Sequence, residues 1–379
     1  MRQVRIPAVA FTLVALALLG GTARAQYNKA AGQNAPLDEV ERSYREKDGT
    51  LRTETVTVAP GQDRFGNAVG NNHDLAIDGA FDGQTVAVIQ LYTMDFDFSL
   101  PRAALKEKGF SVYRWANQPP SPAELEKGLA KASQLWVIAS DRRMLTPEHV
   151  AVIKKFFDAG HGVYIWGDNQ PYYADANVLA EALFGTTMQG DVIGDQTVPV
   201  QTSATTAGLL PNHLLTTGLQ HIYEGITIAT IQPSPKLKPL IYGSANNLVA
   251  AYHDQDGHRA ILDGGFTRLY NKWDTAGTAR YVKNAAAWLV NAERFGDAVI
   301  NPTLRTTVKP PAIRPGDRST TGSTTGSTTR SPIGAAPTIS VPPGGDWLPT
   351  DAIGWMLVSA MGLLLVIGVH ANTRRNDLH

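Results

Sequence analysis

The chain has 379 residues, with 34 basic and 34 acidic side chains, so its formal net charge is zero. A balanced total charge gives no reason to expect nucleic acid or acidic lipid as a partner. The absence of cysteine excludes disulfide bonds, a thiol nucleophile and a zinc–thiolate site. The middle of the chain, roughly 210 residues, is long enough for one domain with a sizeable core.

Residues 1–25 predict a secretory signal peptide. Arg2 and Arg5 precede an apolar run from Ile6 to Leu19, and the small residues Ala23 and Ala25 precede Gln26. A positive start, an apolar centre and a small-residue site are the features that signal peptidase requires. We therefore expect an exported mature chain that begins at Gln26.

Residues 26–84 predict a polar N-terminal extension. Within it, Leu37 to Lys47 suggests a short surface helix. The alternating stretch from Leu51 to Val58 predicts a strand at the edge of the main sheet.

The main domain is expected at residues 85–295 as a doubly wound, mostly parallel α/β sheet. Two of its strands, Leu135–Ala139 and Val163–Trp166, are uninterrupted apolar runs, which is typical of strands covered by helices on both faces. The helix between them begins at Pro147, after Thr146. The other strands and helices alternate in the same way. They are expected at 85–92 (strand), 100–108 (helix), 110–115 (strand), 123–132 (helix), 222–231 and 237–242 (strands), 248–253 with 259–262 (hairpin) and 275–292 (helix). Short strands or a lid are expected within 186–206.

Residues 296–346 are rich in Pro, Thr, Ser and Gly and predict a linker. Residues 347–371 predict a transmembrane helix, because the apolar run 352–371 is long enough to cross a bilayer. Arg374 and Arg375 in the tail 372–379 predict that this end is cytoplasmic. Two alternatives are a buried core helix and a sorting tail that a membrane protease removes. The prediction of a transmembrane helix places the main domain outside the cytoplasm, anchored by a single C-terminal span.

The central segment LTPEHVAVIKKFFDAGHGVYIWGDN follows an apolar strand and a polar edge and leads into a new helix. This pattern resembles the class I glutamine amidotransferase-like fold, and is most similar to its non-catalytic, trehalose-utilisation-like and gliding-protein-like extracytoplasmic relatives. The resemblance covers about Thr85 to Phe295, with NHLLTTGLQHIYEG and HRAILDGGFTRLY standing where such domains carry their last strands. It implies a flavodoxin-like sheet and a place in envelope complexes. Catalytic members present a cysteine after a central strand; here Gly167, Asp168 and Asn169 stand at that turn, which argues against glutaminase chemistry.

Ligand sites in such sheets lie at the carboxyl ends of the strands. Those ends carry Asp141 after one strand, and Asp168 and Asn169 after the next. Asp168 could cap a turn, contact a ligand or form a covalent intermediate, although no activating partner is evident near it in the sequence.

The stretch from Asp263 to Asp274 holds a further cluster, formed by Arg268, Tyr270 and Trp273. Aromatic residues beside arginine are typical of binding hot spots, and a helix N-terminus next to them favours an anion. The alternative is a buried aromatic corner that holds the last helix to the sheet, with Asp274 as its N-cap.

Asp95, Asp97 and Ser99 follow the first strand at alternate positions, and their oxygen atoms suit a hard divalent cation. The spacing is similar to the metal loop of adhesion-type A domains, which have Ser where Asp97 stands. The alternative is loop solvation and capping of the next helix.

Taken together, we expect a membrane-anchored, extracytoplasmic binding or scaffolding domain with a protein partner in the envelope, no cofactor and no complete catalytic constellation. The alternative is an envelope enzyme that acts on a carbohydrate or other polar substrate through Asp168 or a metal at Asp95 and Asp97.

Overall fold

The structure is a computed structural model that describes residues 27–204 and 206–301. The predicted signal peptide, all but the start of the predicted linker, and the predicted membrane span lie outside the described residues. Within the described ranges, no helix has the length and apolar character needed to cross a membrane.

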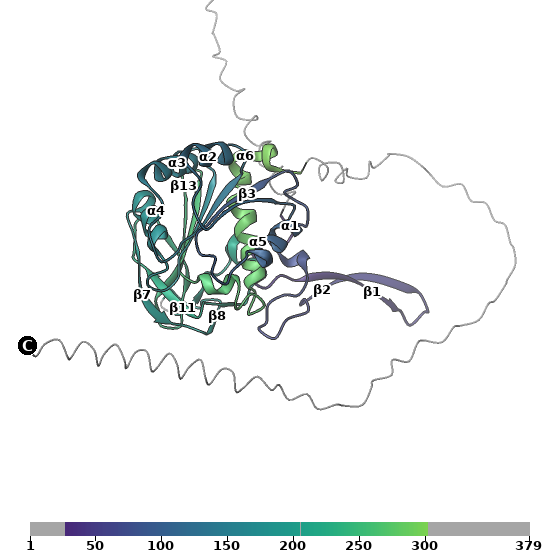
Figure 1. The fold of residues 1–379 in the computed structure, drawn as a ribbon. Coiled ribbons are helices and arrows are strands. Elements are labelled where there is room, and N and C mark those ends of the chain that lie inside the picture. The colour runs from purple at the N-terminus through teal and green to yellow at the C-terminus, as the bar shows by residue number, and fades with distance from the viewer. Residues whose placement is uncertain (1–26, 205, 302–379) are drawn as a thin grey trace, which may run out of the picture. The chain divides into compact units, whose positions relative to one another are not determined.

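An eight-stranded sheet runs through the centre of the domain, in the order β4-β3-β5-β6-β14-β13-β12-β9 (Figure 1). The strands from β4 to β14 are parallel to their neighbours, and those from β14 to β9 are antiparallel. Their bounds are β3 Thr85–Gln90, β4 Ser111–Ala116, β5 Gln134–Ile138, β6 Gly162–Trp166, β9 Gly208–Leu209, β12 Lys238–Tyr242, β13 Leu248–Gln255 and β14 His258–Asp263. The predicted α/β class with a mostly parallel sheet is confirmed.

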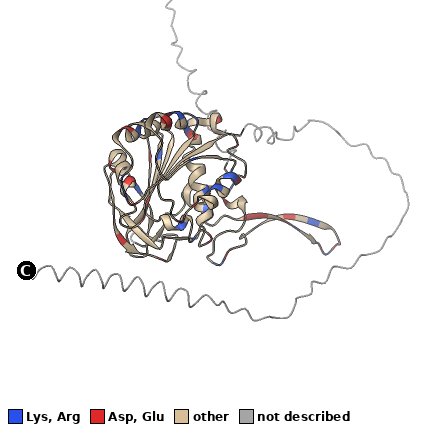
Figure 2. Ribbon diagram, viewed as in Figure 1, with Lys and Arg blue, Asp and Glu red and all other residues tan. Residues whose placement is uncertain are grey.

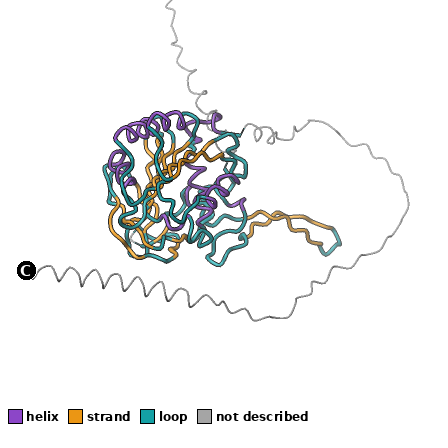
Figure 3. Tube along the Cα trace, viewed as in Figure 1, coloured by secondary structure: helices purple, strands orange, loops and turns teal. Residues whose placement is uncertain are grey.

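Helices cover both faces of this sheet (Figure 3). Successive side chains of a strand point to opposite faces. In β3, Val86 and Val88 join the core cluster under α1 and α5, whereas Ala87 and Ile89 join the cluster under α2, α3 and α4. This double burial explains why the central strands read as unbroken apolar runs. The helices are α1 Ser99–Glu107, α2 Pro122–Leu129, α3 Pro147–Asp158, α4 Ala174–Phe184, α5 Thr278–Leu289 and the short α6 Ala292–Phe295, with 3-10 turns η2 Asn71–His73, η3 Leu214–Thr216, η4 Phe266–Leu269 and η5 Gly296–Val299.

Local sequence signals fix the helix starts. Ser121 and Glu124 form a reciprocal capping box at α2, with Pro122 in the first turn. Pro147 occupies the first turn of α3 after Thr146, as predicted. The N-cap of α5, however, is Gly277 with φ 76°, so the prediction of Asp274 as the cap is wrong. Glycine takes this left-handed conformation at little cost, and α5 therefore begins three residues later than predicted.

The polar extension differs from its prediction. Strands β1 (Asp38–Arg45) and β2 (Leu51–Val58) pair only with each other, in a two-stranded hairpin that extends away from the main sheet (Figure 1). The helix expected at 37–47 is wrong, and so is the placement of 51–58 at the edge of the main sheet. The turn Asp48–Gly49 brings the two segments together, with the Asp48 side chain accepting the Thr50 N–H at 2.8 Å. Both strands carry mixed charges and are largely exposed (Figure 2).

The rest of the extension is part of the domain core. Leu75 and Phe81 lie in the same buried cluster as α1 and α5. Asp74 is buried, and its carboxylate lies 2.9 Å from Lys108 Nζ and 2.7 Å from Lys283 Nζ. Ion pairs therefore connect the segment before β3 to the two helices on that face.

The strand predicted at 222–231 is two strands. β10 (His221–Tyr223) pairs with β8 (Thr197–Pro199), and β11 (Thr227–Ile231) pairs with β7 (Met188–Ile193). The chain breaks at Gly225, whose φ of 123° is accessible to glycine. The short strands expected within 186–206 are confirmed as β7 and β8.

Candidate functional site

The ends of β6 and β14 come together at the carboxyl edge of the sheet. Gly167 N–H donates to the Asp263 carbonyl at 2.8 Å, and Phe266 N–H donates to the Gly167 carbonyl at 3.2 Å. A Cβ at position 167 would lie 2.4 Å from Met188 Sδ, so any larger residue there would displace the Met188 side chain. The backbone thus places Asp168 and Asp263 on adjacent strand ends.

Asp168 is buried, with 5% of its surface exposed, and its Oδ1 accepts no hydrogen bond from any described residue. Its own N–H donates to the Tyr172 carbonyl at 3.1 Å, which closes a tight loop. Burial raises the pKa of Asp168 well above its usual range, and the negative charges of Asp263 and Asp191 raise it further, against the Asn169 N–H and Arg268. Trp166 Nε1 and Arg268 Nε nearby also lack a hydrogen-bond partner among the described residues, but Asp168 Oδ1 is the acceptor at this edge without one.

Half-buried tyrosines surround this edge. Tyr92, just beyond β3, contacts Tyr172 edge-on with ring centroids 5.6 Å apart, and Phe266 at 5.4 Å. Tyr270 stacks obliquely on Phe266 at 5.3 Å. Burial raises the pKa of Tyr270, and the charges of Asp95 and Asp168 raise it further, against the hydrogen bond with Tyr92. The edge therefore combines aromatic surface with hydroxyl groups and one buried acid. We call Tyr92, Asp168, Tyr172, Phe266 and Tyr270 the strand-end cluster.

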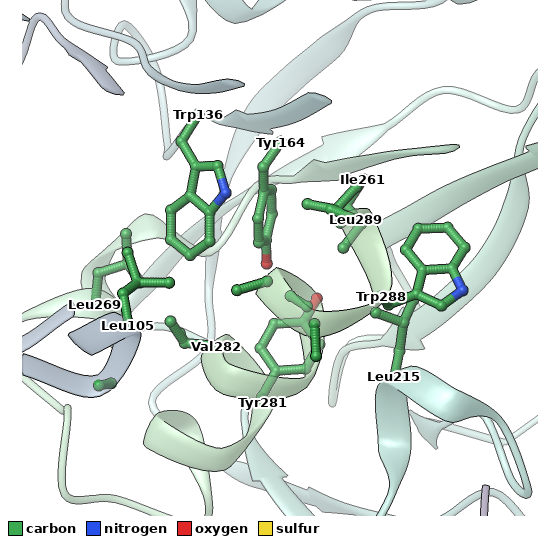
Figure 4. Packing of buried hydrophobic residues seen from close by; sticks show 14 of the residues in the cluster. Leu105, Trp136, Tyr164, Leu215, Ile261, Leu269, Tyr281, Val282, Trp288 and Leu289 are labelled. Atoms are coloured by element: carbon green, nitrogen blue, oxygen red, sulfur yellow. The ribbon is translucent and has the colours of Figure 1, made fainter. Parts of the chain in front are cut away.

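Asp263 is fully buried and fully hydrogen-bonded. Its Oδ2 accepts hydrogen bonds from the hydroxyl groups of Tyr164 at 3.2 Å and Tyr281 at 3.1 Å, which point toward the same space (Figure 4). Its Oδ1 accepts the Gly265 N–H at 3.0 Å and a hydrogen bond from Arg268. Asp263 consequently has no free oxygen with which to bind a ligand.

Arg268 and Trp273 are inside the domain. Arg268 has 0% of its surface exposed, and Trp273 has 8%. The guanidinium also donates to the Tyr223 carbonyl at 3.1 Å and lies over the rings of Trp166 and Tyr281. The exposure that a binding hot spot requires at these two residues is absent, so that assumption was wrong. The residues form the buried aromatic corner that the sequence offered as the alternative.

The remaining predicted ligand residues lie at the surface or at its border. Asp141 is exposed, and its Oδ1 accepts the Ser140 hydroxyl at 3.0 Å. Asn169 accepts the Thr227 hydroxyl at 2.9 Å. Asp274 is exposed and does not cap α5. Contact of these residues with a ligand or partner stays a prediction.

The metal prediction falls on an exposed loop. Asp97 Oδ1 accepts the Ser99 N–H at 2.8 Å, and Asp95 Oδ1 accepts the Tyr92 hydroxyl at 2.8 Å. The hydrogen bond from the Ser99 N–H lowers the pKa of Asp97. These local bonds fit the capping alternative, and metal binding at Asp95, Asp97 and Ser99 stays a prediction.

Another group of carboxylates, Asp74, Asp78 and Glu107, comes within ligand distance of one another. The Lys108 ammonium lies 2.6 Å from Asp78 Oδ1, and the Lys283 ammonium lies 2.9 Å from Glu107 Oε1. With Arg280, whose Nε lies 2.8 Å from Asp74 Oδ1, the two lysines balance the three carboxylates, so this group is an ion-pair network and not a cation site.

The sequence pointed to Asp168 and Tyr270 of the strand-end cluster, but not to its other aromatic residues, Tyr92, Tyr172 and Phe266. Tyr92 was included as the last residue of a strand, and Tyr172 follows the turn Gln170–Pro171 without a motif around it. Only the folded chain brings Tyr92, Tyr172 and Phe266 together, since they come from three separate segments, each beyond a different strand. The signal available was position, since Tyr92 is the last residue of a predicted strand, and Tyr172 and Phe266 each follow the carboxyl end of one.

No family model matches the sequence. No curated protein matches it either. Among solved structures, the chain is similar to a Thermoplasma acidophilum protein described as part of a GMP synthase, with 10% identity and a TM-score of 0.37, over 56% of this chain and 96% of the other. It is similar to a ThuA-like protein of Parabacteroides merdae at 9% identity and 0.39, over 55% and 90%.

A third similar structure is the glutaminase domain of Trypanosoma brucei CTP synthase, at 8% identity and a TM-score of 0.30, over 55% of this chain and 94% of the other. All three are class I glutamine amidotransferase-like folds, the group that the sequence resembles. At TM-scores below 0.5, the likeness assigns neither an activity nor a ligand to this chain.

Proposed function

We propose that this chain is a binding domain of the cell envelope that takes a polar ligand or a partner's polar side chain at its strand-end cluster and performs no chemistry on it. The observation that carries the proposal is the Asp168 carboxyl group, whose Oδ1 has no hydrogen-bond partner among the described residues. A buried polar atom without a partner costs free energy, and a ligand donor that reaches it would recover that cost.

The surroundings of Asp168 favour binding over catalysis. Its carboxylate accepts no side-chain hydrogen bond within residues 27–204 and 206–301, so no described side chain orients or activates it as a nucleophile. The neighbouring carboxylate of Asp263 is fully engaged with Arg268 and two tyrosines. Tyr92 and Tyr172 add aromatic surface with polar edges, which suits a saccharide or a peptide side chain.

The proposed place of action is outside the cytoplasm, on a membrane anchor. Its support is the sequence: a signal-peptide pattern at residues 1–25 and the apolar run at 352–371 followed by Arg374 and Arg375. Deletion of residues 347–379 is expected to move the protein from the membrane pellet to the soluble extracytoplasmic fraction. Retention of the shortened chain in the pellet would contradict the anchor.

The ligand test is site-specific photocrosslinking of the full chain in native membranes. A benzophenone amino acid at Met94, which is 75% exposed and follows Tyr92 by two residues, is the probe, and the same amino acid at Val69, which is 55% exposed, is the control. We expect an adduct from position 94 that weakens in Asp168→Ala, with position 69 giving none. An equal adduct from both positions, or one indifferent to Asp168→Ala, would refute the proposal.

A second candidate is an enzyme with Asp168 as general acid, favoured by the raised pKa of this group. A carboxyl group whose pKa is raised keeps its proton to higher pH and can donate it to a leaving group. Turnover of an envelope saccharide by the purified chain, lost in Asp168→Asn with the fold intact, would favour this function over simple binding.

A further inference from the structure

The outer edge of β4 is open. β4 is the terminal strand on one side of the sheet, where it pairs only with β3. At the two ends of the pairing, the Ser111 and Asn117 N–H groups donate to the carbonyls of Gln84 and Gln90, each at 2.9 Å. Alternation along a strand then turns the N–H and C=O groups of Val112, Arg114 and Ala116 outward. Within residues 27–204 and 206–301, these outward groups have no backbone partner.

Natural edge strands usually carry a device against pairing with other chains: a proline, a bulge, a very short length or a protruding charge. β4 has six residues, no proline and an unbroken register with β3. Its one charged side chain, Arg114, is tied inward to Gln90 Oε1 at 2.5 Å and to the Asp97 carbonyl at 3.0 Å. The strand at the other edge of the sheet, β9, is protected against such pairing by its length, because it has only two residues.

A groove of about 550 Å³ runs between this edge and α2. Its aromatic wall is Tyr113, which is 53% exposed, with its ring edge-on to Trp115 at 4.8 Å. Trp115 packs on Gly128 of α2 so closely that a Cβ there would lie 2.5 Å from Trp115 Cη2. A glycine inside a helix costs about 1 kcal/mol relative to alanine. We attribute its presence at position 128 to the space that the Trp115 ring occupies beside the groove.

The unpaired charge of the groove is positive. Lys127 and Lys131 line it from α2 and the residues just after it, both are exposed, and neither has a carboxylate partner among the described residues. Glu124, the acidic residue in the lining, is occupied in the capping box with Ser121. An acidic occupant therefore complements this surface.

We propose that the β4 edge and its groove bind an extended acidic peptide from a partner protein, which adds to the sheet as one more strand. Alternate residues of a strand lie about 6.6 Å apart on one face, and Lys127, in the last turn of α2, lines the same groove as Lys131, in the turn just after it. Two acidic side chains at positions i and i+2 of the peptide thus reach Lys127 and Lys131. A second copy of this chain fits less well, because a twofold axis through the β4 edge brings the two lysine pairs toward each other.

The binding test uses the full chain in detergent and two fluorescent hexapeptides, Thr-Glu-Val-Glu-Val-Thr and its lysine counterpart Thr-Lys-Val-Lys-Val-Thr. Fluorescence polarisation is expected to show binding of the acidic peptide only. Lys127→Glu/Lys131→Glu should weaken it by about tenfold or more. The matched control Lys47→Glu/Lys106→Glu, which reverses two exposed lysines elsewhere, should leave it unchanged.

Strand addition is tested separately with Ala116→Pro, which removes one outward N–H from an edge position where proline is tolerated. We expect this variant to keep its fold by circular dichroism and to lose most of the peptide affinity. Equal binding of the two peptides, or none, overturns the proposal. The proposal is also overturned if polygalacturonate displaces the acidic peptide and Ala116→Pro leaves the peptide affinity unchanged. That result would mean that the groove binds acidic polymers without strand pairing.

The remaining outcome is self-association. If sedimentation shows a dimer that Ala116→Pro dissociates while the acidic peptide does not bind, the occupant is a second copy and the proposal is wrong. The test of peptide binding does not depend on the strand-end cluster, because the groove and that cluster share no residue. A positive peptide result with no crosslink at Met94 would leave this inference standing and refute the proposed function.

Discussion

The Arg268 guanidinium donates to the Asp263 carboxylate five residues before it, and neither side chain is exposed to solvent. Tyr164 and Tyr281 complete the set of partners on the second oxygen of Asp263. A buried pair of this kind is weak evidence for net stability, but breaking it by removing one partner is costly, since the other charge stays buried.

Arg268→Met is therefore expected to lower the free energy of unfolding by about 3–5 kcal/mol. Asp263→Asn/Arg268→Met should cost clearly less than the sum of the two single changes, because neither charge then remains alone. Urea unfolding followed by tryptophan fluorescence measures both, with exposed Arg142→Met as the control. A loss no larger than that of the control would show that the pair contributes nothing.

Asp168→Asn is expected to stabilise the protein at pH 8 and not near pH 4. The folded-state pKa of Asp168 lies above its unfolded value, so the folded chain holds a proton that the unfolded chain releases. The free energy of unfolding therefore falls as pH rises from about 4 toward the folded pKa. The amide removes this penalty, which we expect to be about 1–3 kcal/mol. A gain of the same size at both pH values would show that ionisation is not its cause.

His213 gives the opposite pH dependence. Burial lowers the pKa of His213 to about 4, with Arg259 and Lys238 contributing in the same direction and Asp254 opposing. In the folded state its Nδ1 accepts the Leu215 N–H at 3.2 Å. The unfolded chain takes up a proton first, so stability is lost as pH falls from about 6.5 to about 4.

His213→Gln should remove this part of the acid sensitivity. Allowing for the partial exposure of the ring, we expect the difference in unfolding free energy between wild type and variant to change by about 2 kcal/mol from pH 7 to pH 4.5. Parallel curves for the two proteins across this range would contradict the assignment.

Gly128→Ala separates two opposing effects in α2. Helix propensity alone would stabilise the alanine variant by about 1 kcal/mol. The new Cβ, however, would lie 2.5 Å from Trp115 Cη2, and displacing the ring is expected to give a net loss of about 1–3 kcal/mol. Thermal unfolding should show a lower Tm than for Gly61→Ala, which adds a Cβ with no atom within 4 Å. Trp115→Leu in the same chain should relieve the loss.

The parallel half of the sheet could be predicted because its signals are local. Val163–Trp166 is apolar on both faces, and Pro147 marks the start of the preceding helix, so the strand and helix follow from neighbouring residues. Strand β1 was misread because its partner, and not its own residues, decides its conformation. Residues 38–45 suit a helix in isolation, but pair along their whole length with β2.

The site was predictable in position but not in composition. Asp168 follows a strand end, and sequence order alone placed it at the edge. Whether Arg268 is exposed depends on Asp263, Tyr164 and Tyr281, which belong to different elements and meet only in the folded core. Tyr92 and Tyr172 are likewise 80 residues apart in the sequence, and only folding brings their rings into contact.

The ion pairs of Asp74 limit how far this domain can be truncated from its N-terminal side. Burial alone would raise the pKa of Asp74, but Lys283, Lys108 and Arg280 together lower it. A fragment that starts at Thr85 would leave Lys108 and Lys283, both buried, without that counter-charge, and it should aggregate or fail to express. The hairpin β1–β2, which pairs only with itself, is the part that can be replaced by a short loop without disturbing these contacts. Soluble fragments for crystallisation should therefore begin no later than Tyr27 and be shortened, where necessary, within the hairpin.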